Sequence, residues 1–517
     1  MLSYFRGKAS IFAAPDPHYP PGPAGDGLSA LAANQLAFYE HITRTHGDFV
    51  PLRFGLRRGI FLNHPSYVEE VLVTQAGKFI KSLALRRSRR LLGNGLLTSE
   101  GEFWRRQRRL AQPAFHRQRI NAYAETMVDS TEALLRGWRD GETLDAHAEM
   151  MRLTLEIVSK TLFGADVGPI AAEVGEAVTI GQEAFTRRIT SWRFFLPDTF
   201  PLPENRPFIR AANRLDEIVY GIIAERRAQR ARGEDRADLL SMLLGAQDDD
   251  GSGMTDKQLR DECMTIFLAG HETTALALSW AWYLLSQNPE AEAALHEELD
   301  SVLGGRAPRV EDLPRLPYCE AVINESMRLY PPAYVQGREA TEDVKLGDYV
   351  VPQGMVVLFS QWVMHRDARY WSNPTTFRPE RWLNGSAPLS PGSTLKRPVT
   401  PEGEPLPRYA YFPFGGGPRL CIGNQFALME AVLLLVTIAQ RYRLRLVPGW
   451  DVSPWTGITL RPKNGVRVTL EERGATAARL AGREDGVELG QRPGDAQEER
   501  RDHQHHESQV GEVGVVH

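Results

Sequence analysis

Most apolar residues of the chain recur at helical spacing, and the longest such run lies near the middle of the sequence. Thr255 and Gln258 form a capping box at its start, and Asn288-Pro289 provides a stop at its end. The run from Thr255 to Gln287 counts 33 residues (287 − 255 + 1), about 50 Å of helix at roughly 1.5 Å per residue. Because it is rich in Ile, Leu, Phe and Trp, this helix is predicted to cross the interior of the protein.

A smaller part of the chain has the pattern of β-strands. Two short strands, 48–54 and 59–63, are predicted around a turn, and the strand-like segment 350–359 is interrupted by Pro352-Gln-Gly354. A final hairpin from Thr459 to Leu470 is predicted to turn at Asn464-Gly465. Residues 65–162 have a helical pattern instead, broken at 93–95 and 112–113.

Composition and charge narrow the class of protein. The 517 residues have a mean hydropathy of -0.34 and a net charge of -4, values of an ordinary globular protein without a global basic field for nucleic acid. Three cysteines in so long a chain do not form a disulfide framework and suit a reducing compartment. Two of them, Cys263 and Cys319, lie in helical patterns and are expected to be core residues.

The N-terminal residues give little sign of a targeting segment. Residues 1–19 are expected to be an irregular lead-in, followed by the proline-rich Pro20-Pro-Gly-Pro23. The apolar patch at 11–14 is too short for a spanning helix and poor for a signal peptide. We therefore expect a cytoplasmic protein without a membrane anchor.

The C-terminal residues change in character after about Glu472. Residues 472–517 contain almost no large apolar side chains, so they cannot bury enough surface to order themselves, and we predict a disordered tail. His503, His505 and His506 within it could bind a metal ion, but a solvated tail is the simpler interpretation.

Candidate chemistry is concentrated in Phe412-Pro-Phe-Gly-Gly-Gly-Pro-Arg-Leu-Cys421-Ile-Gly423, which precedes an apolar helical run, 425–439. Glycines let a backbone pass close to a large planar ligand. The N-terminus of a helix favours a thiolate, and Arg419 can bind an acidic group of the same ligand. A buried free cysteine beside a turn is the alternative. It does not explain why glycines, arginine and helix start converge.

The pattern Phe414-x-x-Gly417-x-Arg419-x-Cys421-x-Gly423 resembles, position for position, the haem-binding loop of the cytochrome P450 family. The resemblance implies that Cys421 is the axial ligand of the iron of haem b, with Phe414, Arg419 and Gly423 around the cofactor. A thiolate ligand pushes electron density toward the iron and favours O–O cleavage. The resemblance also implies the P450 fold, mainly α with a smaller β-rich lobe, as a single domain over residues 20–471.

Ala269-Gly270-His271-Glu272-Thr273-Thr274 is a locally weak stretch inside the long helix. An internal glycine costs about 1 kcal/mol relative to alanine, and adjacent threonines compete for backbone carbonyls. A helix packed tightly at Gly270, with its polar groups paired in the core, explains the hexapeptide equally well by itself. The stretch is similar to the oxygen-binding groove of the family. That similarity implies that O2 lies against Gly270, that Thr273 hydrogen-bonds it, and that Glu272 connects the site to solvent protons.

Each of the remaining motifs, taken alone, is explained equally well as a surface ion pair or an exposed arginine. Their joint positions along the chain favour a functional interpretation. Glu325-x-x-Arg328, with Arg381 downstream, resembles the structural Glu-Arg-Arg triad of the family, whose role is to lock the region of the cysteine loop. The segment Trp104-Arg-Arg-Gln-Arg108 resembles the helix that contacts a haem propionate. Arg338 and Arg419 are then implied to be the other propionate ligands.

The resemblance implies a monooxygenase that inserts one atom of O2 into an apolar substrate such as a fatty acid, a terpenoid or a carotenoid-like molecule. Its electrons would come from NAD(P)H through a reductase and a separate ferredoxin- or flavodoxin-type partner. The acid–alcohol pair Glu272-Thr273 favours this activity over a peroxide-driven peroxygenase. A non-catalytic haem sensor or carrier is a further alternative, which would keep Cys421 and need no such pair.

The substrate chamber is expected from segments around these motifs. Its wall is predicted to include Phe267, Leu268, Ala269, Ala333, Tyr334, Val335 and Ile458, with residues 85–97 overhead. The basic runs 86–90 and 105–109 are solvated faces by default, and a positive face that docks an acidic electron donor is the functional alternative.

Overall fold

The computed structural model describes residues 19–25, 27–55, 57–164, 171–189, 205–234, 238–247, 251–385, 387–389 and 393–474. The lead-in and the tail expected from the sequence therefore lie almost wholly outside the described residues. The described residues up to Arg473 belong to one compact unit. In the part of the chain that is described, no helix combines the length and the apolar character that crossing a membrane requires.

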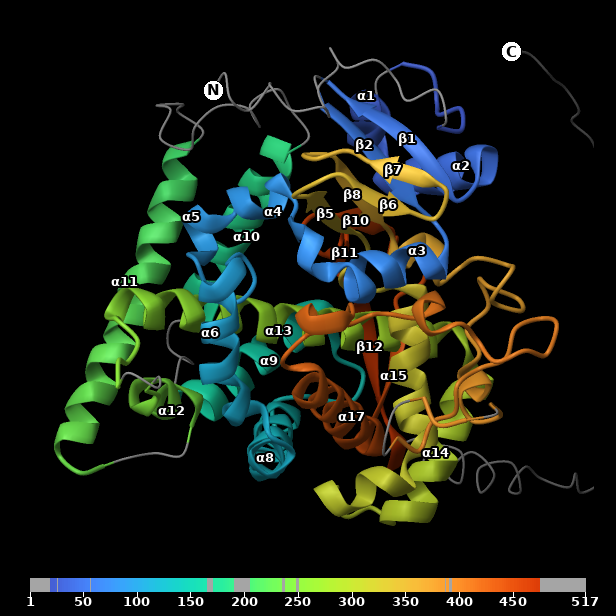
Figure 1. The fold of residues 1–517 in the computed structure, drawn as a ribbon. Coiled ribbons are helices and arrows are strands. Elements are labelled where there is room, and N and C mark those ends of the chain that lie inside the picture. Colours follow the sequence, from blue (N-terminus) through green and yellow to red (C-terminus); the bar gives the residue numbers. More distant parts are fainter. Residues whose placement is uncertain are drawn as a thin grey trace, which may run out of the picture. The chain divides into compact units, whose positions relative to one another are not determined.

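Helices make up most of this unit, and the strands form a smaller β-rich part (Figure 1). The helices are α1 (Gly27–Ala33), α2 (Gln35–His46), α3 (Pro65–Glu69), α4 (Leu83–Arg87), α5 (Arg89–Leu92), α6 (Gly101–Ala111), α7 (Arg117–Ala122), α8 (Ala124–Leu135), α9 (Ala146–Phe163), α10 (Ala171–Ile189), α11 (Asn205–Ala231), α12 (Leu239–Gly245), α13 (Asp256–Gln287), α14 (Pro289–Leu303), α15 (Pro317–Leu329), α16 (Gln361–Met364) and α17 (Asn424–Arg441). The strands are β1 (Phe49–Phe54), β2 (Arg57–Leu62), β3 (Phe79–Lys81), β4 (Thr143–Asp145), β5 (Gln336–Ala340), β6 (Val344–Leu346), β7 (Tyr349–Val351), β8 (Val356–Phe359), β9 (Tyr442–Leu446), β10 (Pro454–Thr456), β11 (Leu460–Pro462) and β12 (Arg467–Glu472). The mainly α fold with a smaller β-rich lobe is confirmed.

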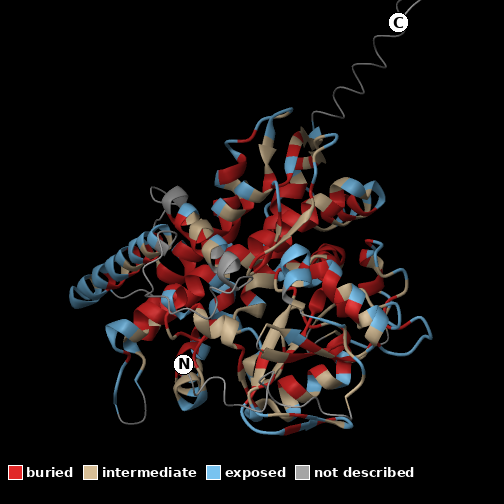
Figure 2. Ribbon diagram, turned by 90° about the horizontal axis from the view of Figure 1, so that it is seen from above, coloured by how far each residue is buried: buried red, intermediate tan, exposed pale blue. Residues whose placement is uncertain are grey.

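The long central helix is α13, and the predicted capping box is present at its start. Thr255 is the N-cap and exchanges hydrogen bonds with Gln258, so the helix proper has 32 residues, one fewer than predicted. Most of its side chains are buried because α9, α11, α15 and α17 pack around it. Figure 2 shows that buried residues lie at the centre of the unit and exposed residues at its periphery.

The largest sheet has the strand order β1-β2-β8-β5-β3. The predicted hairpin of β1 and β2 is confirmed, and β2 also pairs in parallel with β8. Strand β3 lies inside a segment for which the sequence predicts helix. It forms because residues 79–81 add to the sheet edge, where Lys81 pairs with Arg338 of β5 in antiparallel register. This tertiary pairing overrides the local pattern.

The predicted C-terminal hairpin is wrong. Strand β11 pairs with β10, and β12 pairs with β4 and β9, so the strands on either side of Asn464-Gly465 enter different sheets. Gly465 does turn the chain, with φ of 72°. Beyond it, Val466 N–H donates to Asp145 Oδ1 at 2.9 Å, and Ala146 N–H donates to Val466 O at 2.8 Å. These contacts at the start of α9 direct the chain into the β4 sheet.

Candidate functional site

The glycine-rich loop delivers Cys421 to the N-terminal end of α17. Cys421 N–H donates to Phe414 O at 3.1 Å, which closes the loop, and Gly423 is the N-cap of the helix. Gly417 has a φ of 64°, and a Cβ there would collide with the carbonyl of Leu72. Only glycine fits that position, as the sequence pattern indicated.

The thiol of Cys421 differs from the other two thiols of the chain. Cys421 is accessible, whereas Cys263 and Cys319 are buried core residues, as expected. Burial by the surrounding chain nevertheless raises the pKa of the Cys421 thiol. The N–H of Gly423 and the cations Arg108 and Lys81 act in the opposite direction and favour a thiolate.

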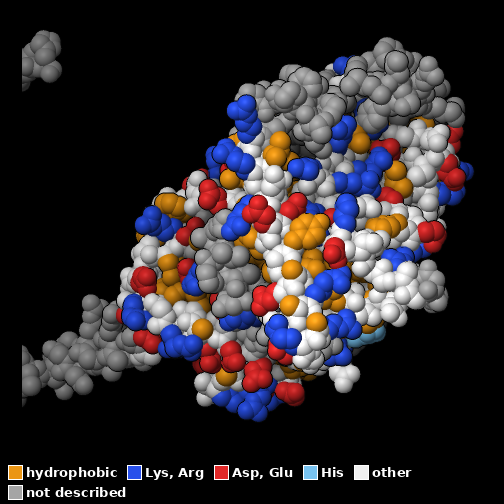
Figure 3. Space-filling view, turned by 90° about the vertical axis from the view of Figure 1, so that its left-hand side faces the viewer, with side chains coloured by type: hydrophobic (Ala, Val, Ile, Leu, Met, Phe, Trp, Pro, Cys, Tyr) orange, Lys and Arg blue, Asp and Glu red, His pale blue; other side chains and the backbone are white. Residues whose placement is uncertain are grey.

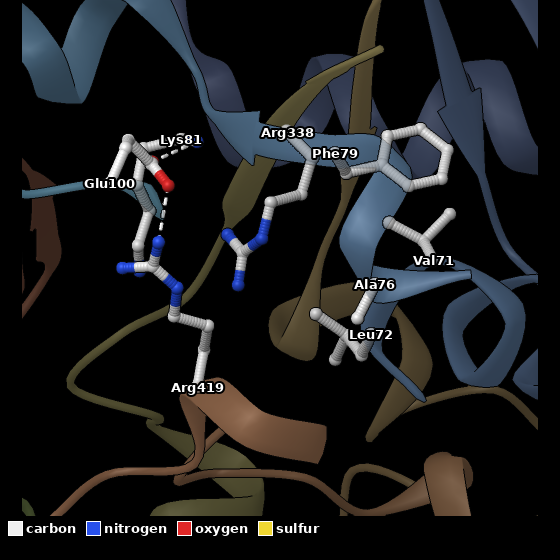
Figure 4. Close-up of a pocket in the computed structure, with 8 residues that line it drawn as sticks. All are labelled: Val71, Leu72, Ala76, Phe79, Lys81, Glu100, Arg338 and Arg419. Carbon is white, nitrogen blue, oxygen red and sulfur yellow. Dashed lines mark hydrogen bonds and ion pairs between the residues drawn. The ribbon is translucent and has the colours of Figure 1, made fainter. Parts of the chain in front are cut away.

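A small pocket near this loop gathers cationic side chains (Figure 4). Arg338 and Arg419 point into the pocket, and Lys81, which the sequence analysis missed, contributes to its wall. Glu100 forms an ion pair with Arg419. The other side is apolar and consists of Val71, Leu72, Ala76 and Phe79.

These cations are an electrostatically costly arrangement by themselves. Lys81 and Arg338 are directly opposed on neighbouring strands, where like charges destabilise a sheet. Burial and the charges of Arg338 and Arg419 hold the pKa of Lys81 well below its usual value. Burial and Arg419 lower the pKa of Arg338 to about 10. A ligand with two carboxylates beside an apolar ring would relieve this repulsion, and haem has that chemistry.

The remaining predicted propionate residues lie on α6 and take different positions. The Trp104 ring lies under the guanidinium of Arg419, 3.9 Å from its carbon to the ring centroid. Arg108 instead donates to Leu420 O at 2.9 Å and therefore contacts the cysteine loop itself. The structure thus brings Trp104, Arg338 and Arg419 together, while Arg108 supports the loop and its thiol.

Glu325, Arg328 and Arg381 form a fully buried network. Glu325 accepts hydrogen bonds from Arg328 Nε at 2.9 Å and Arg381 Nε at 3.0 Å, and also from Trp382 Nε1 at 3.0 Å. Burial would raise the pKa of Glu325, but the two guanidinium groups outweigh it and hold the pKa below its usual value. The motif is a buried charge cluster and not a surface ion pair.

His365 connects this network to the cysteine loop. Arg328 donates to His365 O at 2.8 Å, and Phe412 N–H donates to His365 Nε2 at 3.1 Å. No spacing in the sequence marks this histidine, because its role depends on segments that meet only in the fold. The contact explains physically how the triad can fix the start of the loop.

On α13, accessible residues interrupt an otherwise buried stretch. Ala269 is exposed, and Gly270 and Thr273 are half-buried, although their neighbours on either side are buried. Thr273 Oγ1 donates to Ala269 O at 2.8 Å. A Cβ on Gly270 would lie 3.0 Å from Val158 Cγ2 of α9, so tight helix packing and an open groove coexist at this glycine.

Glu272 lies away from solvent. It is 4 % exposed, and it accepts hydrogen bonds from Thr459 Oγ1 and from Arg461 Nε, the latter at 2.8 Å. Burial would raise its pKa, but Arg461 and the Thr459 hydroxyl outweigh it and hold the pKa below the usual value. The carboxylate is therefore not at the surface, and the 459–461 segment holds it in the interior.

A second buried carboxyl, Glu430 of α17, stands near the threonine pair and was not found from the sequence. Burial raises its pKa to about 8, and the hydroxyl of Thr274 offsets this only in part. Among the described residues it forms no ion pair, so it is neutral at pH 7. Its position within an apolar helical run was the available signal.

The expected chamber residues separate into two groups. Ala269, Ala333, Val335 and Ile458 retain accessible surface. Phe267 instead packs against Phe163, with ring centroids 5.9 Å apart. Tyr334 is 2 % exposed and donates its hydroxyl to Gln35 Oε1 at 2.7 Å. The rings of Phe267 and Tyr334 are therefore engaged in other contacts and do not share the accessible surface of the first group.

Several arginines of the basic runs have specific partners. Arg86 pairs with Glu339 at 2.7 Å, and Arg89 donates to Thr98 O at 2.8 Å. Arg106 contacts the 252–253 segment. On the face shown in Figure 3, basic side chains are interspersed with acidic ones and do not form one continuous field. These runs are therefore partly structural.

The cysteine loop, the cationic pocket and the buried triad together define a haem-thiolate protein. The family profile described as Cytochrome P450 matches residues 24–468. The chain is 42% identical to "Cyclooctatin synthase" of Streptomyces melanosporofaciens, over 82% of this chain and 88% of that protein. It is 38% identical to "Cyclooctat-9-en-7-ol 5-monooxygenase" of the same organism, over 78% and 84%, and 33% identical to "Pentalenene oxygenase" of Streptomyces avermitilis, over 83% and 91%.

The chain belongs to the cytochrome P450 family, and it is a monooxygenase of that family. Family membership implies a haem cofactor, the use of O2, a redox partner and a lipophilic substrate.

Proposed function

We propose that this P450 binds haem b through Cys421 and inserts one oxygen atom into a terpenoid substrate, with electrons from a ferredoxin-type partner in the cytoplasm. One observation carries the cofactor assignment. An accessible thiol, whose burial-raised pKa is partly offset by Arg108 and Lys81, lies close to a pocket whose opposed cations need carboxylate partners. In this proposal Arg338, Arg419 and Lys81 hold the propionates, and Trp104 supports Arg419.

The bound haem would supply the activation of O2, and the residues of this chain would position the reactants and move protons. The accessible stretch of α13 gives O2 a place beside Gly270. The Thr273 hydroxyl, which donates to its own helix at 2.8 Å, can rotate to donate toward the groove. Protons would reach it from Glu272 after release from Arg461, or from the neutral Glu430 through Thr274.

The substrate class rests on the wall of the chamber and on the relatives. Ala269, Ala333, Val335 and Ile458 are apolar, accessible and small or branched, which suits a compact hydrocarbon skeleton. The relatives include a cyclooctat-9-en-7-ol 5-monooxygenase and a pentalenene oxygenase, whose names carry cyclic hydrocarbon skeletons. A terpenoid is therefore favoured over a long-chain fatty acid.

The electron donor is proposed to dock near α6, since Arg105 is exposed and Arg108 contacts the loop of Cys421. Association with an acidic ferredoxin would weaken as salt is raised.

The test is a reconstituted reaction of the haem-loaded protein with ferredoxin, reductase and NAD(P)H, on a panel of terpenoids and fatty acids. We expect a hydroxylated terpenoid only when O2 and the partner are present. Product from hydrogen peroxide alone, at an equal rate, would establish the peroxygenase alternative. The absence of product under both conditions, with haem bound, would favour a sensor or carrier.

A further inference from the structure

A carboxyl group lies on the same face of α13 as the oxygen groove, and nothing in the proposed chemistry uses it. Residues 262, 266, 269 and 273 are spaced by four, three and four positions, so they share one face of the helix. Glu262 is seven residues before Ala269, about 10 Å along the axis at roughly 1.5 Å per residue. That separation is comparable with the length of a fused-ring terpenoid skeleton.

Glu262 is buried and only half satisfied. It is 1 % exposed, and its Oε2 accepts the N–H of Leu96 at 3.0 Å. Its Oε1 has no hydrogen-bond partner among the described residues. A buried polar atom without a partner is rare in native proteins and points to a missing water or ligand group.

The environment makes Glu262 a hydrogen-bond donor as well as an acceptor. Burial, together with the charge of Asp261, raises its pKa to about 8, and the N–H of Leu96 offsets this only in part. The group is therefore protonated at pH 7, and a carboxylic acid carries one O–H. It is also accompanied by apolar Leu96 and Ile266, an arrangement typical of a specificity contact in a lipophilic site.

The neighbouring residues Asp261 and Arg260 already attach the overlying 91–96 segment to α13, so both oxygens of Glu262 are not required for that attachment. Asp261 Oδ2 accepts Asn94 N–H at 2.9 Å and Lys257 Nζ at 2.7 Å. Arg260 donates to Leu91 O at 3.1 Å. The 91–96 segment is thus held on α13 by fully paired groups, while one oxygen of Glu262 remains available.

We propose that Glu262 is a substrate-recognition residue, whose free oxygen hydrogen-bonds a hydroxyl group at the end of the substrate remote from the oxidised carbon. This inference rests on the proposed terpenoid monooxygenase function and narrows it: the substrate is already an alcohol. Its hydroxyl must then come from an earlier oxygenation or from a cyclisation ended by water, so this enzyme acts second or later.

The experiment compares two probes, a polycyclic diterpene hydrocarbon and its monohydroxylated derivative, by the spin-state change that each causes in the haem-loaded protein. We expect the wild type to bind the alcohol roughly tenfold more tightly, the ratio that corresponds to about 1.4 kcal/mol. Glu262→Leu should bring the two dissociation constants together. Glu262→Gln, which keeps a donor and an acceptor, should retain most of the preference.

Asp261→Asn is the matched control, because it changes a neighbouring carboxylate whose oxygens are already paired, and it should leave the ratio unchanged. Equal binding of the two probes by the wild type, or an unchanged ratio in Glu262→Leu, would overturn the inference and leave a buried water as the partner of Oε1. If Glu262→Leu does not fold, Glu262→Met provides the same test, and an unchanged ratio of the two dissociation constants in that variant would equally overturn the inference. Failure of both probes to change the wild-type spectrum would overturn the terpenoid assignment itself, and this inference with it.

Discussion

On the cysteine side of the site, the buried carboxylate of Glu325 receives hydrogen bonds from two guanidinium groups and an indole. On the α13 side, Glu430 has no cation and one oxygen of Glu262 has no hydrogen-bond partner among the residues that the structure describes. The pKa of Glu325 is held below its usual value, whereas burial raises those of Glu430 and Glu262 to about 8. Similar burial thus leaves Glu325 charged but Glu430 and Glu262 neutral, and the α13 carboxylate that stays charged, Glu272, is the one paired with Arg461.

This difference in pairing corresponds to two tasks, holding the cofactor loop on one hand and moving protons or recognising substrate on the other. A charge cluster with every partner in place fixes one geometry, which suits a loop that must hold a cofactor. Neutral acids that have no cationic partner can exchange hydrogen bonds with water, substrate or a hydroxyl group, which suits proton movement and recognition. The following predictions test the comparison.

The largest effect is expected at the thiol. Cys421→Ser should abolish oxygenation and the thiolate signature in the absorption spectrum of the reduced, carbon-monoxide-bound protein, because a serine hydroxyl does not supply a thiolate ligand. Cys319→Ser, at a buried core thiol, is the control and should keep both signals. Retained turnover in Cys421→Ser would contradict the assignment of Cys421 as the axial ligand.

The next effect concerns the charge cluster. Glu325→Gln leaves Arg328 and Arg381 buried without their counter-charge, and the loss of one partner of a buried pair costs about 3–5 kcal/mol. Urea unfolding and haem occupancy measure it, and both should fall. Glu320→Gln on the same helix is the control, since Glu320 accepts only from Thr394 among the described residues and has no cationic partner there. Equal losses in the two variants would show that the cluster has no special role.

The same contrast explains which features the sequence could predict. The α13 helix and the Glu325–Arg328 spacing depend on local periodicity and capping, and both appear in the structure as predicted. Lys81 and His365 were missed because their roles arise from a strand pairing and from a contact between distant segments. Phe267 was placed in the chamber, but a helical run that is apolar on all sides does not reveal which face meets α9.

The end of the chain shows a related limit. Asn464-Gly465 is a strong hairpin signal, and Gly465 does turn the chain. The partner strands are chosen by Asp145, which accepts Val466 N–H and lies more than 300 residues away. Turn chemistry predicts where a chain reverses, but it does not specify which strand the chain then joins.

A more moderate effect is expected on the α13 side. Thr273→Ala removes the one hydroxyl on the accessible stretch while leaving haem binding intact. Product formed per NAD(P)H consumed should fall roughly tenfold, with the lost electrons recovered as hydrogen peroxide, because proton delivery by a positioned group contributes at least this much. Thr273→Ser keeps the hydroxyl and should stay coupled. Tight coupling in Thr273→Ala would remove this residue from the proton path.

The smallest effect concerns the pH dependence of stability, where the two buried acids that flank the threonine pair should differ in sign. A raised pKa means that the folded state holds the proton of Glu430 more tightly than the unfolded state, so its contribution to stability decreases as pH rises from about 4.5 to about 8. The free energy of unfolding of Glu430→Gln, relative to that of the wild type, should therefore rise by roughly 1–3 kcal/mol between pH 5 and pH 7.5.

Glu272 provides the opposite case within the same helix pair. Its lowered pKa contributes stability above the usual value of 4.5, and that contribution is lost as pH falls through the folded pKa. Glu272→Gln should thus be destabilised relative to the wild type at neutral pH and approach it in acid. Denaturant unfolding at a series of pH values measures both variants. Parallel pH curves for the two would mean that Glu430 is charged at neutral pH, and its contrast with the paired carboxylates Glu325 and Glu272 would fail.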